Sequence, residues 1–107
     1  MAVVMTMEWP GVSEKDYLAV LKELQLDANP AKGLLFHVAT FGQDGGMRVV
    51  DVWESPEAFK TFSDQRIVSA VQKVGVSTQP KIEFHPAYNI YAPGLSRLGS
   101  MGASSMP

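Results

Sequence analysis

Along this chain the apolar positions change period several times, and each change marks the border of a predicted element. Four runs are rich in β-branched, methionine and aromatic residues, a composition that is typical of strands. These predicted strands cover residues 2–8, 34–41, 47–53 and 81–91. The glycine-rich stretch 42–46 joins the second run to the third and predicts a hairpin loop.

Two stretches with apolar residues at helical spacing lie between these runs, and each begins with a capping signal. Ser13, with Asp16 three positions later, predicts the start of the first helix. Ser55 followed by Pro56 predicts the start of the second, which we expect to bend or break near Asp64. The resulting order, βαββαβ, is that of a ferredoxin-like α+β fold with a four-stranded antiparallel sheet.

The two middle strands carry apolar side chains on both faces of the predicted sheet. Alternation places one set on the first face: Leu34, Phe36, Val38, Val50 and Val52. It places another set on the second face: Leu35, Ala39, Phe41, Val49 and Trp53. Two helices can cover only one face, so a second copy of the sheet is the simplest cover for the other. The pattern therefore predicts a homodimer whose sheets pack face to face, as in a dimeric α+β barrel.

Length and composition narrow the range of functions. At 107 residues the chain forms one domain, which we place at residues 1–92, and the glycine- and serine-rich residues 93–107 are expected to be a flexible tail. Basic and acidic residues nearly balance and no basic run occurs, so we expect no nucleic-acid partner. No signal peptide and no apolar run of ~20 residues occurs, which predicts a cytoplasmic protein without membrane contact. The lack of cysteine excludes disulfides and thiolate chemistry.

Two polar residues interrupt the apolar middle strands. If the hairpin closes through residues 42–46, His37 lies directly opposite Asp51, with Cβ atoms ~5 Å apart. A buried carboxylate needs a partner, and an imidazole held by a carboxylate can act as a general base. His37 and Asp51 are therefore candidate catalytic residues. The alternative is a polar pair that only fixes the strand register or crosses a dimer interface.

A second histidine lies in the last predicted strand. His85 and Tyr88 are further candidates for acid–base chemistry, although Pro86 between them indicates an edge strand or a bulge. His85 can equally be a surface residue. The histidines do not have the spacing of a metal site, so we expect no metal.

The stretch V-W-E-S-P-E-A-F at residues 52–59, where a strand runs into a helix, resembles the dimeric α+β barrel superfamily. The most similar branch is the antibiotic-biosynthesis monooxygenase-like one, and the resemblance spans about residues 2–91. It implies a homodimer with a small apolar pocket in each subunit.

Relatives in that superfamily that degrade haem resemble W-E-S-x-x-x-F-x-x-W, with an iron-binding histidine ten residues after the second tryptophan. Phe62 and Gln72 occupy those two positions here. An asparagine that these relatives use on the first strand also has no counterpart. The comparison therefore argues against haem degradation, and we expect no cofactor.

The remaining activities implied by the resemblance act on hydrophobic, aromatic or polyketide-like molecules. The leading expectation is a cofactor-independent monooxygenase; the alternatives are a polyketide cyclase with a His/Tyr acid–base pair, and a non-catalytic dimer that binds a small molecule or acts in stress. Aromatic residues could line the pocket, although ordinary core and interface packing explains them equally well. They are Tyr17, Phe36, Phe41, Trp53, Phe59 and Phe62.

Overall fold

The computed structural model describes residues 1–98, and it confirms an α+β fold with a four-stranded antiparallel sheet. The strands are β1 (Val3–Trp9), β2 (Leu34–Phe41), β3 (Met47–Trp53) and β4 (Lys81–Pro86). The helical elements are α1 (Glu14–Leu24), α2 (Pro56–Phe62), the π-helix η1 (Ser63–Ile67), α3 (Val68–Val74) and α4 (Leu95–Leu98). Within the described part of the chain, no helix is long and apolar enough to cross a membrane.

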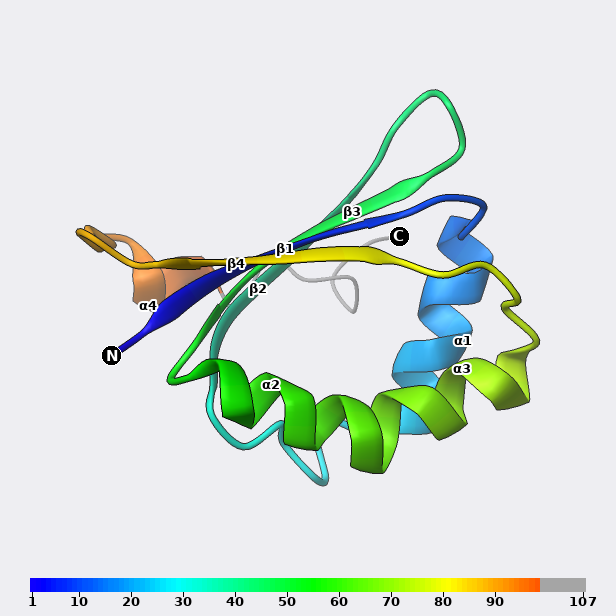
Figure 1. The fold of residues 1–107 in the computed structure, drawn as a ribbon, viewed down its shortest axis with the longest axis horizontal. Helices are drawn as coiled ribbons and strands as arrows, with labels where there is room; N and C mark the ends of the chain where they lie inside the picture. Colours follow the sequence, from blue (N-terminus) through cyan, green and yellow to red (C-terminus); the bar gives the residue numbers. More distant parts are fainter. Residues whose placement is uncertain (99–107) are drawn as a thin grey trace.

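The sheet has the order β2-β3-β1-β4, with antiparallel pairing throughout. Figure 1 shows α1, α2 and α3 on one side of this sheet, with β2 and β3 joined by a hairpin that extends beyond the helices. Alternation along the central strand β1 points Met5, Met7 and Trp9 at the helices, where all three are buried. The core therefore lies between the sheet and one helical layer.

Both long helices begin as their sequences predict. The Ser13 side chain accepts a hydrogen bond from the Asp16 N–H at 3.1 Å, and the Asp16 carboxylate accepts one from the Ser13 N–H at 3.2 Å, which completes a capping box. The Ser55 side chain accepts a hydrogen bond from the Ala58 N–H at 3.1 Å and so caps α2 without a reciprocal bond, and Pro56 lies in the first turn. The break expected near Asp64 is present as the π-helix η1, which joins α2 to α3 without interrupting the helical layer.

The π-helix carries a side chain that connects two elements of the helical layer. Arg66 donates hydrogen bonds to the backbone carbonyls of Leu24 at 2.6 Å, Asn29 at 2.7 Å and Pro30 at 3.2 Å. Its guanidinium also lies 5.0 Å from the centre of the Phe62 ring, within cation–π range. Arg66 therefore fixes the C-terminal end of α1, and the loop after it, to the second helix.

A bulge near the start of β2 places Leu34 and Leu35 on sheet faces opposite to those predicted. Leu34 pairs with Trp53 and Phe36 pairs with Val52, so Leu35 is an extra residue between them. As a result Leu34 faces the helices and Leu35 is exposed, the reverse of the simple alternation.

The sheet face away from α1, α2 and α3 also carries apolar residues. We call this surface the open face and define it as Val4, Phe36, Val38, Val50 and Val52. Val38 and Val50 keep 41% and 40% of their surface exposed. The prediction of a second apolar sheet face therefore holds for the described residues, and the homodimer it suggested stays a prediction.

The last strand is shorter than predicted. β4 ends at Pro86 rather than at residue 91, because proline has no N–H for the ladder and the chain then leaves the sheet. Beyond it, the short helix α4 falls inside the segment predicted as a flexible tail. The rest of that predicted tail, residues 99–107, lies outside the described residues.

Candidate functional site

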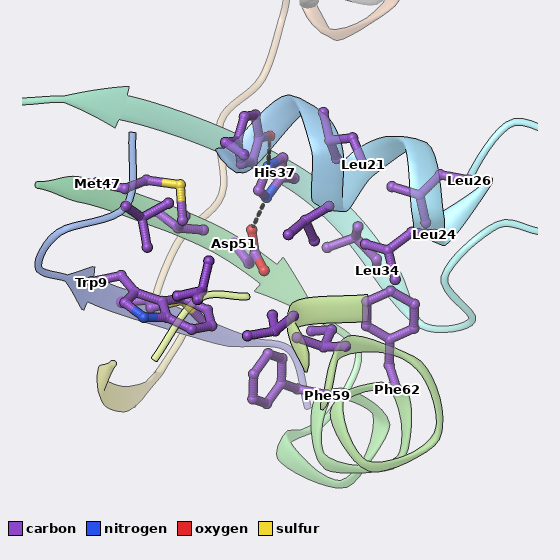
Figure 2. A pocket seen from close by; sticks show the side chains of 18 of the residues that line it. Trp9, Leu21, Leu24, Leu26, Leu34, His37, Met47, Asp51, Phe59 and Phe62 are labelled. Carbon is purple, nitrogen blue, oxygen red and sulfur yellow. Dashed lines mark hydrogen bonds and ion pairs between the residues drawn. The ribbon is translucent and has the colours of Figure 1, made fainter. Parts of the chain in front are cut away.

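A cavity of about 160 Å³ lies between the helix-facing side of the sheet and the helices. Figure 2 shows His37 and Asp51 at one end of it and Phe59 and Phe62 at the other. Nearly all the side chains around it are apolar. Those lining it besides the residues discussed below are Met7, Trp9, Val12, Val20, Leu21, Leu24, Leu26, Leu34, Met47, Val49, Ile67, Val71 and Val76.

Four side chains form one continuous hydrogen-bonded chain at the polar end. The register confirms the predicted pairing of His37 with Asp51, and their Nδ1 and Oδ1 atoms lie 2.6 Å apart. The second carboxylate oxygen of Asp51 accepts a hydrogen bond from the Trp53 indole at 2.9 Å. On the far side of the imidazole, the Tyr17 hydroxyl lies 2.6 Å from His37 Nε2.

With Asp51 ionised and His37 neutral, each hydrogen bond in this chain has a definite direction. An ionised carboxylate only accepts, so the Asp51 oxygens receive hydrogens from His37 Nδ1 and from the Trp53 indole. In the neutral imidazole Nε2 then has a free lone pair, and the Tyr17 hydroxyl donates to it. The Asp51 side chain is 6% exposed, whereas the His37 side chain keeps 31% of its surface exposed. The base therefore lies where a ligand entering from solvent can reach it.

Tyr17 is held in its protonated form. Burial, together with the negative charge of Asp51, raises the pKa of Tyr17 to about 12. Its ring stacks on His37 with centroids 6.0 Å apart and meets Phe41 edge-on at 5.9 Å. At neutral pH it is thus a hydrogen-bond donor that occupies the lone pair of the base.

The structure gathers most of the predicted aromatic residues around this cavity. Tyr17, Trp53, Phe59 and Phe62 line it, and the Trp53 ring lies 5.5 Å from Phe59 and 5.7 Å from Phe62. Phe41 does not line the cavity itself and packs behind Tyr17. Phe36 lies on the open face, because the register puts it opposite Val52, so it does not contribute to the cavity wall.

The structure does not bring the other two predicted residues to this site. His85 pairs with Val4, which places it on the side of the sheet away from the helices. Tyr88 follows the end of β4 and is fully exposed. The expectation for Tyr88 depended on a strand that continued past Pro86, whereas His85 lies within β4 but on the face away from the cavity.

Besides the contact between Tyr17 and His37, two features of the site were not predicted from the sequence. One is the role of the Trp53 indole as a donor to Asp51. The two residues lie two positions apart on one strand and so share a sheet face, which would have allowed this contact to be predicted. The other is the aliphatic wall from α1 and α3, which belongs to the apolar stripes of those helices. Among residues 1–98, no group of three or more histidine, aspartate or glutamate side chains could hold a metal ion.

Comparison with known proteins adds structural relatives only. No protein-family model and no curated protein sequence matches the chain. Among solved structures, SnoaB from Streptomyces nogalater, a cofactor-independent oxygenase, is 12% identical with a TM-score of 0.63, and the match covers 83% of this chain and 95% of SnoaB.

Two further solved structures extend this likeness. The monooxygenase of ActVA-Orf6 from Streptomyces coelicolor, solved with nanaomycin D, is 17% identical with a TM-score of 0.58 over 87% of this chain and 93% of its own. A candidate antibiotic biosynthesis monooxygenase from Chloroflexus aurantiacus is 14% identical with a TM-score of 0.62, over 88% of this chain and all of its own. At these identities the likeness shows the fold, so the chain shares its fold, over most of its length, with proteins of the antibiotic-biosynthesis monooxygenase group.

Proposed function

We propose that this protein is a cofactor-independent monooxygenase that acts on a small hydroxy-aromatic molecule. The observation that carries the proposal is His37, held between Asp51 and Tyr17 at the wall of an otherwise apolar cavity. An imidazole fixed by a carboxylate in a water-poor pocket suits the removal of a proton from a hydroxyl group. The fold shared with SnoaB, a cofactor-independent oxygenase, supports the same proposal.

The proposed reaction uses the substrate as the reductant. The substrate hydroxyl replaces the Tyr17 hydroxyl at His37 Nε2, which takes its proton, and Asp51 stabilises the imidazolium that forms. The electron-rich anion then reacts with O₂ at a ring carbon. One oxygen atom becomes a carbonyl on that carbon and the other leaves as water with the two hydrogens the substrate loses, which balances the conversion of a phenol to a quinone.

The test is oxygen uptake by the metal- and flavin-free protein with a series of hydroxy-aromatic substrates. His37→Gln should reduce turnover by about 10²- to 10⁴-fold, the usual contribution of a general base. His85→Gln is the matched control, because it removes the other histidine from the opposite side of the sheet. Equal turnover in the two variants would exclude His37 as the base.

A cyclase is the second candidate, because Tyr17 and His37 form an acid–base pair at 2.6 Å. A cyclase consumes no oxygen, so product formation at an unchanged rate under nitrogen would favour it over the monooxygenase. Stable binding without turnover in either atmosphere would instead favour a non-catalytic ligand carrier.

We also propose that the protein is a homodimer through the open face. Val38 and Val50 are exposed on this face, and a second copy of the face would cover them. Light scattering should give twice the 11.7 kDa mass of one chain. Val50→Lys should shift the protein to the monomer, whereas Val68→Lys, an exposed valine on α3, should not. A wild-type protein that is monomeric at micromolar concentration would contradict the proposal.

A further inference from the structure

The size of the cavity limits the ligand it can enclose. An engineered cavity of about 150 Å³ in another protein, lined by aliphatic and aromatic side chains, stays dry and binds benzene. The cavity here has about 160 Å³. It therefore has room for one aromatic ring with a small substituent, and a second fused ring would have to project out of this volume or displace its walls.

The hydrogen-bonding capacity of the cavity wall lies at one end only. Two tryptophans contribute indole N–H groups, but Trp9 donates to the Thr78 carbonyl at 3.0 Å and Trp53 donates to Asp51. Each carboxylate oxygen of Asp51 already accepts one hydrogen bond, and the side chain is buried. A ligand hydroxyl can form a hydrogen bond at the contact between the Tyr17 hydroxyl and His37 Nε2, either by joining this contact or by replacing Tyr17 in it.

The opposite end of the cavity is built of hydrocarbon. Phe59 and Phe62 lie there, away from His37, and Leu24 and Leu34 lie along one side between them (Figure 2). A ligand hydroxyl pushed into this region would lose its hydrogen bonds to water and find no replacement. Such an unsatisfied buried group costs about 1–3 kcal/mol, which is about a 5- to 150-fold loss of affinity.

Resting on the proposed function, we propose that the cavity selects a single-ring aromatic with one hydrogen-bonding group. The hydroxyl of this ligand meets His37 and Tyr17, and the far side of its ring is apolar. The class is that of para-alkyl phenols rather than para-diphenols or fused polycyclic phenols. Because the selection concerns binding, it can be tested separately from turnover.

The first experiment compares four probes by titration calorimetry without oxygen. Para-cresol and hydroquinone have nearly the same shape and differ by a methyl and a hydroxyl group at the end far from the base. We expect hydroquinone to bind at least about fivefold more weakly than para-cresol. Toluene, which lacks the hydroxyl, and naphthol, which adds a ring, should both bind more weakly than para-cresol.

Two results would overturn the inference. Hydroquinone that binds as tightly as para-cresol would show a polar partner at the far end, and naphthol that binds more tightly would show a larger site. If para-cresol is selected but no oxygen is consumed, the inference stands and the proposed oxygenase activity fails. If oxygen is consumed with polycyclic substrates instead, the activity stands and the inference fails.

A pair of variants on one helix tests where the probe binds. Val71 lines the cavity, whereas Val68 on the same helix is exposed and lies outside it. Val71→Phe should reduce para-cresol affinity at least tenfold by filling the cavity, and Val68→Phe should leave it unchanged. If Val71→Phe does not fold, Val20→Phe fills the same cavity from α1. Unchanged para-cresol binding in either folded cavity variant would overturn the inference.

Discussion

Replacing Asp51 with asparagine should keep the hydrogen bonds of the site but reverse the direction of those that His37 makes. Asparagine offers one acceptor and one donor group where the carboxylate offers two acceptors. The Trp53 indole can only donate, so the amide oxygen must turn toward it and the amide NH₂ toward His37. The imidazole Nδ1 then has to accept, which moves its hydrogen to Nε2 and removes the lone pair that would act as the base.

The size of the stability change follows from the contacts. Asp51→Asn keeps two hydrogen bonds, at His37 and at Trp53, but makes both of them neutral. Bonds to charged groups contribute about 1.5–3 kcal/mol and neutral ones about 0.5–1.5 kcal/mol, so we expect a loss of about 1–3 kcal/mol in total. Asp51→Leu should cost more, about 2–6 kcal/mol, because both donors lose their partner and each unsatisfied group costs about 1–3 kcal/mol.

Two measurements check this prediction. Urea denaturation gives the free energies of unfolding of both variants relative to wild type. Nitrogen-15 NMR reports which imidazole nitrogen carries the hydrogen, and His85→Gln leaves His37 as the only histidine in the spectrum. A His37 that keeps its hydrogen on Nδ1 in Asp51→Asn would refute the argument, because the carboxylate would then not determine the tautomer. Equal destabilisation by asparagine and leucine would refute it as well.

Two other predictions concern Tyr17 and Arg66. The pKa of Tyr17 is raised from 10.0 to about 12, so the folded state binds the phenolic proton more tightly than the unfolded state does. The stability that this difference contributes should be fully present below pH 10 and should be lost as the pH rises to about 12. Urea denaturation at several pH values should show this loss in wild type and less of it in Tyr17→Phe. Arg66→Lys should lower stability by about 1–3 kcal/mol and speed hydrogen exchange in residues 25–33, because one ammonium cannot reproduce the three carbonyl contacts. The Lys73→Arg variant, on an exposed side chain, should change neither quantity.

The elements that the sequence predicted correctly are those with strong local signals. The short loop at 42–46 fixes antiparallel pairing by geometry, so the opposition of His37 and Asp51 could be calculated before the structure was known. Ser13 and Ser55 cap their helices through contacts within three residues along the chain. Such features depend on neighbours in sequence, and they need no knowledge of tertiary packing.

The features that were not predicted depend on contacts between distant segments. The bulge at Leu35 arises where β2 meets the end of β3, and no residue type marks it in advance. The contact between Tyr17 and His37 requires a particular position of α1 over the sheet. Because β4 ends at Pro86, Tyr88 lies outside the site. The proline indicated an irregularity in the strand, but its presence alone does not distinguish a bulge from the end of the strand.

Through Arg66 the cavity wall is linked to a side chain that does not itself line the cavity. Arg66 holds the C-terminal end of α1 through the Leu24 carbonyl, and Tyr17 lies on the same helix about 10 Å along its axis from Leu24. A substitution at position 66 should therefore change the position of Tyr17 relative to His37 while every cavity-lining side chain keeps its identity. For engineering, this position offers a way to alter the geometry of the contact between Tyr17 and His37 without altering the chemistry of the cavity wall.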